Sequence, residues 1–147
     1  MIQEQCEITR FQAADFDGIV AIDARTSGRE KRAFWRDFFS RNAANPNTMC
    51  LVAKADSEVI GYLVGEIRAY EFGQEPSGWV LSLGVVPEKG RRGCGRSLLE
   101  EFGKWVKENG IQKIRTMVTH EQTVLHRFFR STGFGAGPYT QLEQELS

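Results

Sequence analysis

Residues 83–99 read Leu-Gly-Val-Val-Pro-Glu-Lys-Gly-Arg-Arg-Gly-Cys-Gly-Arg-Ser-Leu-Leu and separate two apolar segments of different period. Residues 79–86 are nearly all apolar, which is typical of a strand covered on both faces. From Gly95 to Asn109 the apolar side chains recur at the spacing of an amphipathic helix, and Gly110 suits a left-handed cap after it. The stretch therefore predicts a central strand, a glycine-rich turn and a helix.

The turn itself combines glycines with positive charge. Four of the fifteen glycines fall within residues 84–95, and residues 88–96 carry four cationic side chains against Glu88, a local charge of +3. A helix start exposes unpaired N–H groups and the positive end of the helix dipole, and glycines let a ligand approach the backbone. This coincidence predicts a binding site for an anion, with a solvated basic turn as the alternative.

A nucleotide-binding P-loop is one explanation of this turn. Residues 90–97 differ by one substitution from the pattern GxxxxGK[ST], because Arg96 stands where Lys is required. A nucleotide hydrolase also needs an Asp at the end of a neighbouring strand to hold magnesium, and the next predicted strand, 111–119, ends without one. We interpret the match as a coincidence and keep a nucleotide-dependent phosphotransferase only as a remote alternative.

A second match covers nearly the whole chain. The segments 83–87 (Leu-Gly-Val-Val-Pro), 92–95 (Arg-Gly-Cys-Gly) and 98–99 (Leu-Leu) resemble motif A of the GNAT superfamily of acyl-CoA-dependent N-acyltransferases, in which a strand ending V-x-P leads into Q/R-x-x-G-x-G/A and a helix. Residues 128–134, Phe-Phe-Arg-Ser-Thr-Gly-Phe, resemble the end of that family's motif B, Y-x-x-x-G-F. The length of 147 residues agrees with one such domain over residues 1–147.

The resemblance implies an α/β (α+β) fold with a mixed, mostly antiparallel central sheet of six to seven strands, about four flanking helices and a splay at the central strand. The patterns of the remaining segments agree with this order of elements. The other predicted helices span residues 13–23, 29–42 and 122–131. The other predicted strands span residues 8–11, 48–54, 59–72, 111–119 and 139–146.

By the same resemblance, acetyl-CoA is the co-substrate and no metal takes part. The N–H groups from Arg91 to Ser97 would hold the coenzyme pyrophosphate, and the edge of the central strand would bond the pantetheine amides. Gly84 suits either a β-bulge or a close approach in that strand. The coenzyme-binding residues implied are Leu83, Gly84, Val85, Arg91, Arg92, Gly93, Cys94, Gly95, Arg96, Ser97, Gln122 and Phe129.

The catalytic groups are predicted from chemistry rather than from a matching motif. Phe129 stands where the family often has a Tyr as general acid, and Gln122 stands where many members have Asn. Transfer to an amine needs a base, and Glu66 and Glu71 are the candidates, with solvated carboxylates as the alternative interpretation. The remaining candidates near these positions are Ser82 as a holder of water and, for the acid, Tyr139 or His126.

These residues predict an N-acetyltransferase that moves an acetyl group from acetyl-CoA directly to a primary amine of a small molecule or peptide. A non-catalytic acyl-CoA-binding module is the alternative. Residues 56–75 carry five carboxylates against Arg68, a local charge of −4, which favours a cationic acceptor. The sequence leaves the choice between a monomer and a homodimer open.

Composition limits the other partners. The 19 Lys and Arg balance the 19 Asp and Glu, and a net charge of zero argues against a general nucleic-acid binder. No apolar run is long enough to cross a bilayer, so we expect no membrane partner. The three cysteines, Cys6, Cys50 and Cys94, are odd in number and widely spaced, which predicts neither a disulfide framework nor a metal site and suggests the cytoplasm.

Overall fold

The computed structural model describes residues 6–87 and 93–147. The chain forms two compact units, one ending at Met117 and the other spanning Val118–Ser147. Two of the predicted coenzyme-binding residues, Arg91 and Arg92, lie outside the described residues. The assignment of residues 1–147 to a single domain stays a prediction.

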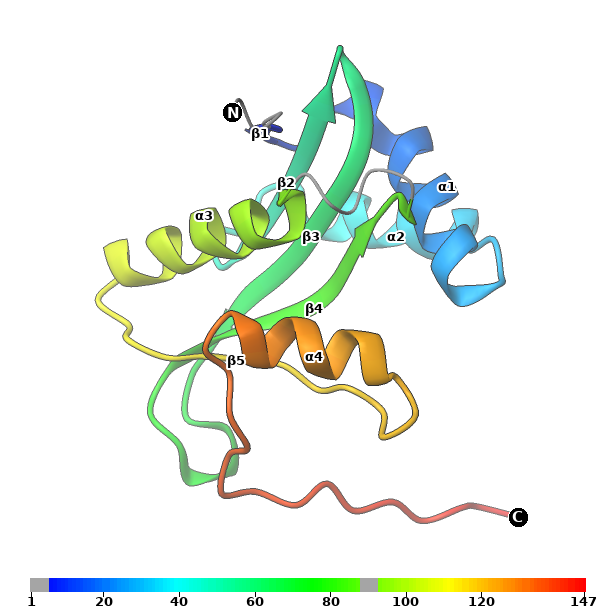
Figure 1. Ribbon diagram of the computed structural model, residues 1–147. Coiled ribbons are helices and arrows are strands. Elements are labelled where there is room, and N and C mark those ends of the chain that lie inside the picture. Colours follow the sequence, from blue (N-terminus) through cyan, green and yellow to red (C-terminus); the bar gives the residue numbers. More distant parts are fainter. Residues whose placement is uncertain (1–5, 88–92) are drawn as a thin grey trace. The chain divides into compact units, whose positions relative to one another are not determined.

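The first unit is built on a mixed, mostly antiparallel sheet (Figure 1). Its order is β1-β2-β3-β4-β5, in which the first three pairs are antiparallel and β4 and β5 are parallel. This confirms the predicted type of sheet. The strands are β1 (Glu7–Arg10), β2 (Thr48–Ala55), β3 (Glu58–Arg68), β4 (Ser77–Val85) and β5 (Ile114–Arg115).

In the described part of the chain the sheet has five strands, so the prediction of six to seven is wrong. Within the described residues, no strand forms over 139–146, where Leu142 and Leu146 are both 87% exposed. In a strand these two leucines would share one face with the polar residues Thr140 and Gln144, so the segment has too little apolar surface to hold it against the sheet. The predicted strand 111–119 is also reduced to the two residues of β5.

The predicted strand 59–72 ends early, at Arg68. Tyr70 and Phe72 adopt positive φ angles of 60° and 54°, which the extended backbone does not allow. A short 3₁₀ turn, η2 (Glu71–Gly73), follows instead and leads into β4. Both aromatic side chains of this turn are exposed, so the aromatic composition that suggested a longer strand belongs to a surface turn.

Residues 6–87 and 93–147 contain four α-helices, which agrees with the predicted number of about four. Gly28 ends the first of them with a φ of 79°, and Gly110 follows the third with the same φ, which confirms its predicted left-handed conformation. A 3₁₀ turn, η1 (Ala13–Asp15), precedes the first helix. The helices are α1 (Phe16–Ser27), α2 (Arg32–Asn42), α3 (Cys94–Glu108) and α4 (Thr123–Ser131), the last in the second unit.

The two faces of the sheet are covered by different helices (Figure 1). Tyr62 of β3 meets the ring of Trp35 of α2 edge-on, with 5.9 Å between ring centroids. Gly65, three residues along β3, lies under Phe102 of α3. Because positions an odd number apart in a strand point to opposite faces, α2 and α3 lie on opposite sides of the sheet. Ile22 of α1 lies on the Tyr62 side, beside Gly84.

One expectation about the cysteines is wrong, because Cys6 and Cys94 form a disulfide. Their Cα atoms are 5.7 Å apart, within the usual range for such a bond. Cys6 immediately precedes β1, and Cys94 is the first residue of α3 and is fully buried. The number of cysteines therefore gives no guide to the compartment, and a cytoplasmic location stays a prediction.

The third cysteine, Cys50, is a free thiol on β2. Burial, together with the neighbouring carboxylate of Asp15, raises the pKa of the Cys50 thiol well above its ordinary value. This thiol therefore stays protonated in the folded protein at a pH where an exposed cysteine is ionised.

We expect this thiol to make the protein less stable in alkali. A raised pKa in the folded state means that stability is complete below the ordinary thiol pKa and falls as pH rises above it, because only the unfolded thiol loses its proton. Between pH 8 and pH 10.5 the free energy of unfolding should fall by about 2 kcal/mol on this account. Urea titrations of the wild type and Cys50→Ala measure it, and equal pH dependence in both proteins would contradict the assignment.

Candidate functional site

The site is built around a β-bulge in β4. Ser82 lies opposite Val64 of β3, and Val80 lies opposite the next residue, Gly65, so that Leu81 has no partner across the ladder. An extra residue of this kind bends its strand and increases the local twist. The bulge therefore lies at Leu81 and not at Gly84, for which the sequence had suggested a bulge or a close approach.

Directly after Val80, β4 and β5 separate. The two strands pair only at Gly78 with Ile114 and at Trp79 with Arg115, and the Thr116 hydroxyl donates to the Val80 carbonyl at 3.0 Å. The ladder between β4 and β3, in contrast, continues as far as Val85. Among the described residues, β4 beyond the bulge therefore has a strand partner on one side only.

The backbone groups on the open side of β4 follow from the ladder on the other side. The N–H of Val86 donates to the carbonyl of Ile60 of β3 at 2.8 Å. Successive residues of a strand direct their backbone groups to alternate sides, so Gly84 also faces β3. The N–H and C=O groups of Leu83 and Val85 consequently face the open side, where a ligand with amide groups can bind as an added strand.

Close packing on the sheet face covered by α1 and α2 requires a glycine at position 84. A Cβ at this position would lie 2.8 Å from Cε1 of Tyr62 and 3.0 Å from Cγ2 of Ile22. The close-approach alternative is thus the one the structure supports. The atoms that approach Gly84 belong to the protein's own core.

The N-terminus of α3 supplies a second set of donors. Gly93 precedes it with a φ of 77°, and the N–H of Ser97 already donates to the Gly93 carbonyl at 3.0 Å. The backbone N–H of Ser97 is therefore not available to a ligand, which corrects the predicted run of donors from Arg91 to Ser97. The N–H groups of Cys94 and Gly95 belong to the first turn, which helix geometry leaves without intrahelical partners and which carries the positive end of the dipole.

Ser82 and Tyr62 form a polar pair next to the bulge. The Tyr62 hydroxyl and the Ser82 hydroxyl are 2.7 Å apart, on the sheet face covered by α1 and α2. Burial raises the pKa of the Tyr62 phenol, although the hydrogen bond with Ser82 opposes this shift. The phenol is therefore neutral, either hydroxyl can donate in this pair, and the Ser82 oxygen can also hold a water molecule or a substrate N–H group.

The two candidate bases share one cation. The Arg68 guanidinium lies 2.7 Å from Glu66 and 3.8 Å from Glu71, and its own position is set by the Trp79 ring, 5.3 Å below it. Glu66 lies opposite Trp79, and Trp79 precedes the Leu81 bulge by two residues of β4. The Glu66 side chain is partly buried. Glu71 lies in η2 with its side chain 45% exposed. Of the two carboxylates, only Glu66 lies near the point where β4 opens.

The acidic stretch 56–75 does not form one surface. Asp56 lies in the turn between β2 and β3 and Glu58 begins β3, whereas Glu66 lies towards the other end of that strand. Eight residues of extended chain put Glu58 and Glu66 roughly 25 Å apart. A cationic ligand at the bulge would meet the Glu66 end of this stretch and not the Asp56 end.

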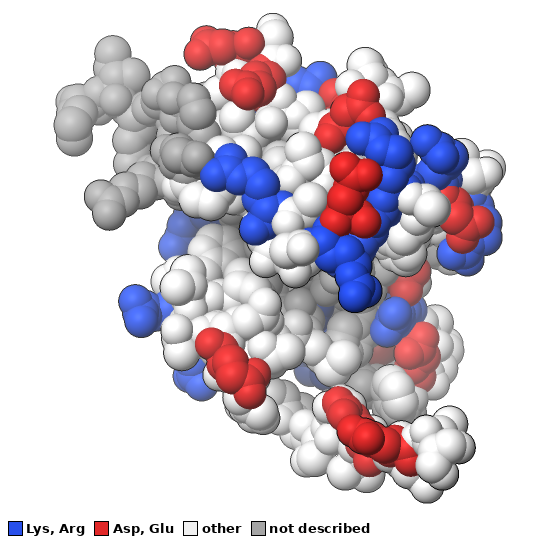
Figure 2. All heavy atoms as spheres, turned by 90° about the vertical axis from the view of Figure 1, so that its right-hand side faces the viewer, with Lys and Arg blue, Asp and Glu red and all other residues white. Residues whose placement is uncertain are grey.

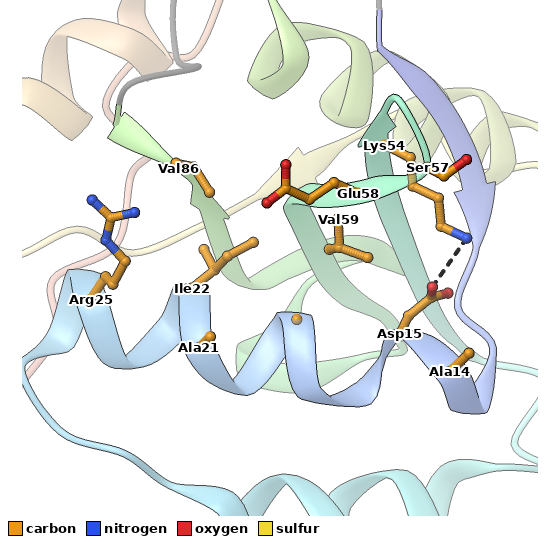
Figure 3. A pocket seen from close by; sticks show the side chains of 11 residues that line it. Ala14, Asp15, Ala21, Ile22, Arg25, Lys54, Ser57, Glu58, Val59 and Val86 are labelled. Atoms are coloured by element: carbon orange, nitrogen blue, oxygen red, sulfur yellow. Dashed lines mark ion pairs between the residues drawn. The ribbon is translucent and has the colours of Figure 1, made fainter.

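A pocket of about 470 Å³ opens between α1 and the β2–β3 turn (Figure 3). An ion pair between Lys54 and the buried carboxylate of Asp15, 3.1 Å long, closes one end of it. Val86 lines the opposite side. Val86 is five residues beyond the bulge, a separation of roughly 15 Å along a strand, so this pocket is not where Leu81 opens β4.

Charged side chains around α1 and α2 are of mixed sign. Arg32 pairs with Asp17 at 2.7 Å, and Arg41 pairs with Asp37 at 2.8 Å. Figure 2 accordingly shows blue and red side chains next to one another on this side of the molecule, with no broad area of one sign. On this surface, positive and negative side chains are therefore paired with one another and not separated into an acidic and a basic region.

Four predicted residues belong to the second unit, which is described by itself; one of them, His126, has its Nε2 atom 2.9 Å from the Thr119 carbonyl oxygen. Gln122 precedes α4, and its side-chain oxygen accepts the Thr119 N–H at 3.2 Å. Phe129 is buried and packs edge-on against Phe134, 5.0 Å between ring centroids. Tyr139 is half exposed. Phe129 has no proton to donate, so the structure gives α4 no obvious general acid at that position.

Some residues that shape the site are absent from the sequence prediction. Arg68 was counted only as a charge, although it shares a strand face with Glu66 two residues away, a spacing that could have indicated the ion pair. Leu81 gives no signal in the sequence, because a bulge depends on the register of the neighbouring strand. Tyr62 looks like any aromatic core residue.

In the described parts of the chain, no group of His, Cys, Asp and Glu is placed to hold a metal ion, and no helix is long and apolar enough to cross a membrane.

Comparison with known proteins identifies a family over most of the chain. Residues 15–134 match the model of the acetyltransferase (GNAT) family. No curated protein sequence matches the chain significantly.

Solved structures of this fold align over nearly the full length. The aminoglycoside 6'-N-acetyltransferase AAC(6')-IG from Acinetobacter haemolyticus is 20% identical, with a TM-score of 0.80 over 96% of this chain and 99% of its own. AAC(6')-Iy, in complex with the bisubstrate analogue CoA-S-monomethyl-acetylneamine, is 15% identical, with a TM-score of 0.85 over 98% and 100%. A transcriptional regulator from Bacillus halodurans is 17% identical, with a TM-score of 0.82 over 97% and 100%. At these identities the likeness shows the fold alone.

Proposed function

We propose that this chain, which belongs to the GNAT family of acetyltransferases, transfers an acetyl group from acetyl-CoA directly to the primary amine of a small molecule or peptide. The observation that carries the proposal is the open edge of β4 after the Leu81 bulge. A structure of the same fold in complex with a coenzyme A bisubstrate analogue supports the choice of acyl donor.

The open edge and the start of α3 suit different parts of the coenzyme. The carbonyl of Leu83 and the backbone groups of Val85 would pair with the pantetheine amides, as a strand pairs with its neighbour. The first turn of α3, with Cys94, Gly95 and the exposed side chain of Arg96, would face the pyrophosphate. Arg91 and Arg92 stay predicted contributors to the same charge.

The bulge would mark the place of the chemistry. The amine nitrogen attacks the thioester carbonyl carbon, a C–N bond forms, the C–S bond breaks and the nitrogen gives up a proton. We propose that Glu66 accepts this proton, directly or through a water held at Ser82, and that the N–H of Leu83 donates to the carbonyl oxygen. Glu71 would remain outside this step because it is exposed and lies beyond Arg68.

The leaving thiolate must also take up a proton or leave as the anion. Phe129 replaces the usual Tyr, and this observation favours the alternative that the chain binds acyl-CoA without catalysis. Tyr139 stays the predicted acid. Release of free thiol in the presence of an amine separates the two functions, since a binding module would be stabilised by acetyl-CoA and release none.

We propose a cationic acceptor. Two carboxylates, Glu66 and Glu71, flank a single arginine, Arg68, which leaves one negative charge in excess near the bulge. The fold relatives that act on aminoglycosides, which are multiply charged amines, support this class of acceptor. A screen in which aminoglycosides, polyamines and Lys peptides all fail while a neutral amine is acetylated would overturn it. A cytoplasmic location and a monomeric or dimeric state stay predictions.

Val85→Pro tests the open edge. Proline removes the one N–H of Val85, which faces away from β3, so the ladder with β3 should persist. We expect acetyl-CoA to bind about tenfold more weakly, the effect of one lost hydrogen bond. Calorimetric titration with acetyl-CoA measures the affinity.

Val85→Ala is the matched control, because it shortens the same side chain and keeps the N–H. It should bind acetyl-CoA like the wild type. Equal losses in both variants would assign the effect to the side chain and contradict strand pairing. Stabilisation of the wild type by Mg-ATP but not by acetyl-CoA would overturn the acetyltransferase proposal in favour of a phosphotransferase.

A further inference from the structure

We propose that the Cys6–Cys94 disulfide is a site of reversible exchange with low-molecular-weight thiols, and that its redox state sets the affinity for the coenzyme. The second part rests on the proposed function. The observation behind it is the place of the bond, which ties the first residue of α3 to the residue that precedes β1.

The two sulfur atoms differ in access. Cys94 is fully buried, whereas Cys6 is only partly buried. An incoming thiolate would therefore attack the Cys6 sulfur. Cys94 would then be the leaving group, and the positive end of the α3 dipole stabilises the thiolate that departs.

Two molecules of a small thiol reduce the Cys6–Cys94 bond in this exchange. The first thiolate forms a mixed disulfide with Cys6 and breaks the bond to Cys94, whose sulfur takes a proton from water. A second thiolate attacks the bound thiol's sulfur and releases Cys6. Two electrons pass from two small thiols to the protein disulfide, and a small-molecule disulfide is the product. The same small disulfide is the oxidant for the reverse reaction.

The bond would act on the coenzyme through the first turn of α3. Cys94 and Gly95 carry the N–H groups proposed to face the pyrophosphate. β1 is held by four residue pairs to β2, so the disulfide anchors that turn to the sheet. Reduction removes the anchor and leaves the donors less well positioned, which weakens binding of a ligand that needs them ordered. Coupling between two sites commonly amounts to 5–150-fold, and we expect about tenfold here.

Cys50 is the free cysteine against which alkylation of the disulfide cysteines is counted. Its protonated thiol is a poor nucleophile, because the thiolate is the reactive form. After denaturation all free thiols react, so alkylation should label one cysteine per chain in the oxidised form and all three in the reduced form.

The affinity test uses S-ethyl coenzyme A, a thioether without a free thiol. Calorimetry on the wild type should give about tenfold weaker binding after reduction with a phosphine than before it. Cys6→Ser, which leaves the buried Cys94 in place, should bind like the reduced wild type with or without reductant. Cys50→Ser should keep the full difference. Circular dichroism of each sample shows whether the reduced forms remain folded.

A second readout does not depend on enzymatic activity. By thermodynamic reciprocity, the thioether must stabilise the disulfide by the factor by which the disulfide strengthens its binding. In glutathione redox buffers, a saturating thioether should lower the reduction potential of the pair by about 30 mV, the equivalent of a tenfold change. Alkylation followed by mass measurement gives the oxidised fraction.

The outcomes separate the two proposals. Equal affinities of the oxidised and reduced wild type, with both folded, would overturn the control of binding. A bond that glutathione does not reduce in the native protein would overturn the exchange site. Failure of the thioether to bind in either form would overturn the proposed function and the coupling together, while alkylation would still decide whether exchange occurs.

Discussion

Glu66→Gln is expected to lower kcat by about a hundredfold, the lower range for the loss of a general base. Glutamine keeps the size of the side chain and can still accept a hydrogen bond from Arg68, 2.7 Å away in the wild type. It cannot take a proton from the amine. Steady-state kinetics with acetyl-CoA and an accepted amine measure kcat, and KM for acetyl-CoA should stay the same because Glu66 lies before the open edge of β4.

Glu71→Gln is the matched control, because Glu71 contacts the same guanidinium from an exposed turn. We expect less than a threefold change in kcat, in line with the small contributions of exposed ion pairs. Similar losses in the two variants would mean that the Arg68 cluster has only a structural role.

Gly65→Val is expected to destabilise the protein by about 3 kcal/mol or more, the upper range for overpacking a core. A Cβ on Gly65 would lie 2.5 Å from Cζ of Phe102 and 2.7 Å from the Trp79 carbonyl oxygen. The carbonyl belongs to β4 beside the bulge, so relief requires moving either α3 or the strand that opens the site. In a chain of this length the melting temperature should fall by about 10 °C.

Gly103→Ala is the control for this change, because it adds a methyl group to α3 with no atom within 4 Å. It should raise stability slightly, since alanine favours a helix interior more than glycine. Differential scanning calorimetry compares the melting temperatures. A Gly65→Val protein as stable as the wild type would show that α3 does not press on the sheet as closely as the structure indicates.

The parts of the fold that were predictable are those encoded by local patterns. The amphipathic spacing from Gly95 to Asn109 and the apolar run 79–86 each contain enough periodicity to define α3 and β4. Gly110 marks the end of α3 for the same local reason, the positive φ that glycine tolerates. The motifs around these elements were also sufficient to indicate the family.

The remaining features depend on which segments meet. Leu81 becomes a bulge only because Val80 and Ser82 pair with consecutive residues of β3. The Cys6–Cys94 bond joins residues 88 positions apart, and no count of cysteines predicts such a pair. Residues 139–146 form no strand because, among the described residues, the few apolar side chains of the segment find no neighbouring strand or core to pack against, and Leu142 and Leu146 are exposed. The catalytic roles of Glu66, Ser82 and Tyr139 stay predictions, because they depend on where a bound substrate places its reacting atoms.

The disulfide also changes how the chain responds to mechanical force. The bond closes a ring of 88 residue steps that contains β1 to β4 with α1 and α2, so only the segments outside the ring can be drawn out by tension on the two ends. At about 3.4 Å per extended residue, the ring conceals about 300 Å of contour length. Single-molecule stretching should recover this length after reduction, and the oxidised protein should yield a correspondingly shorter trace.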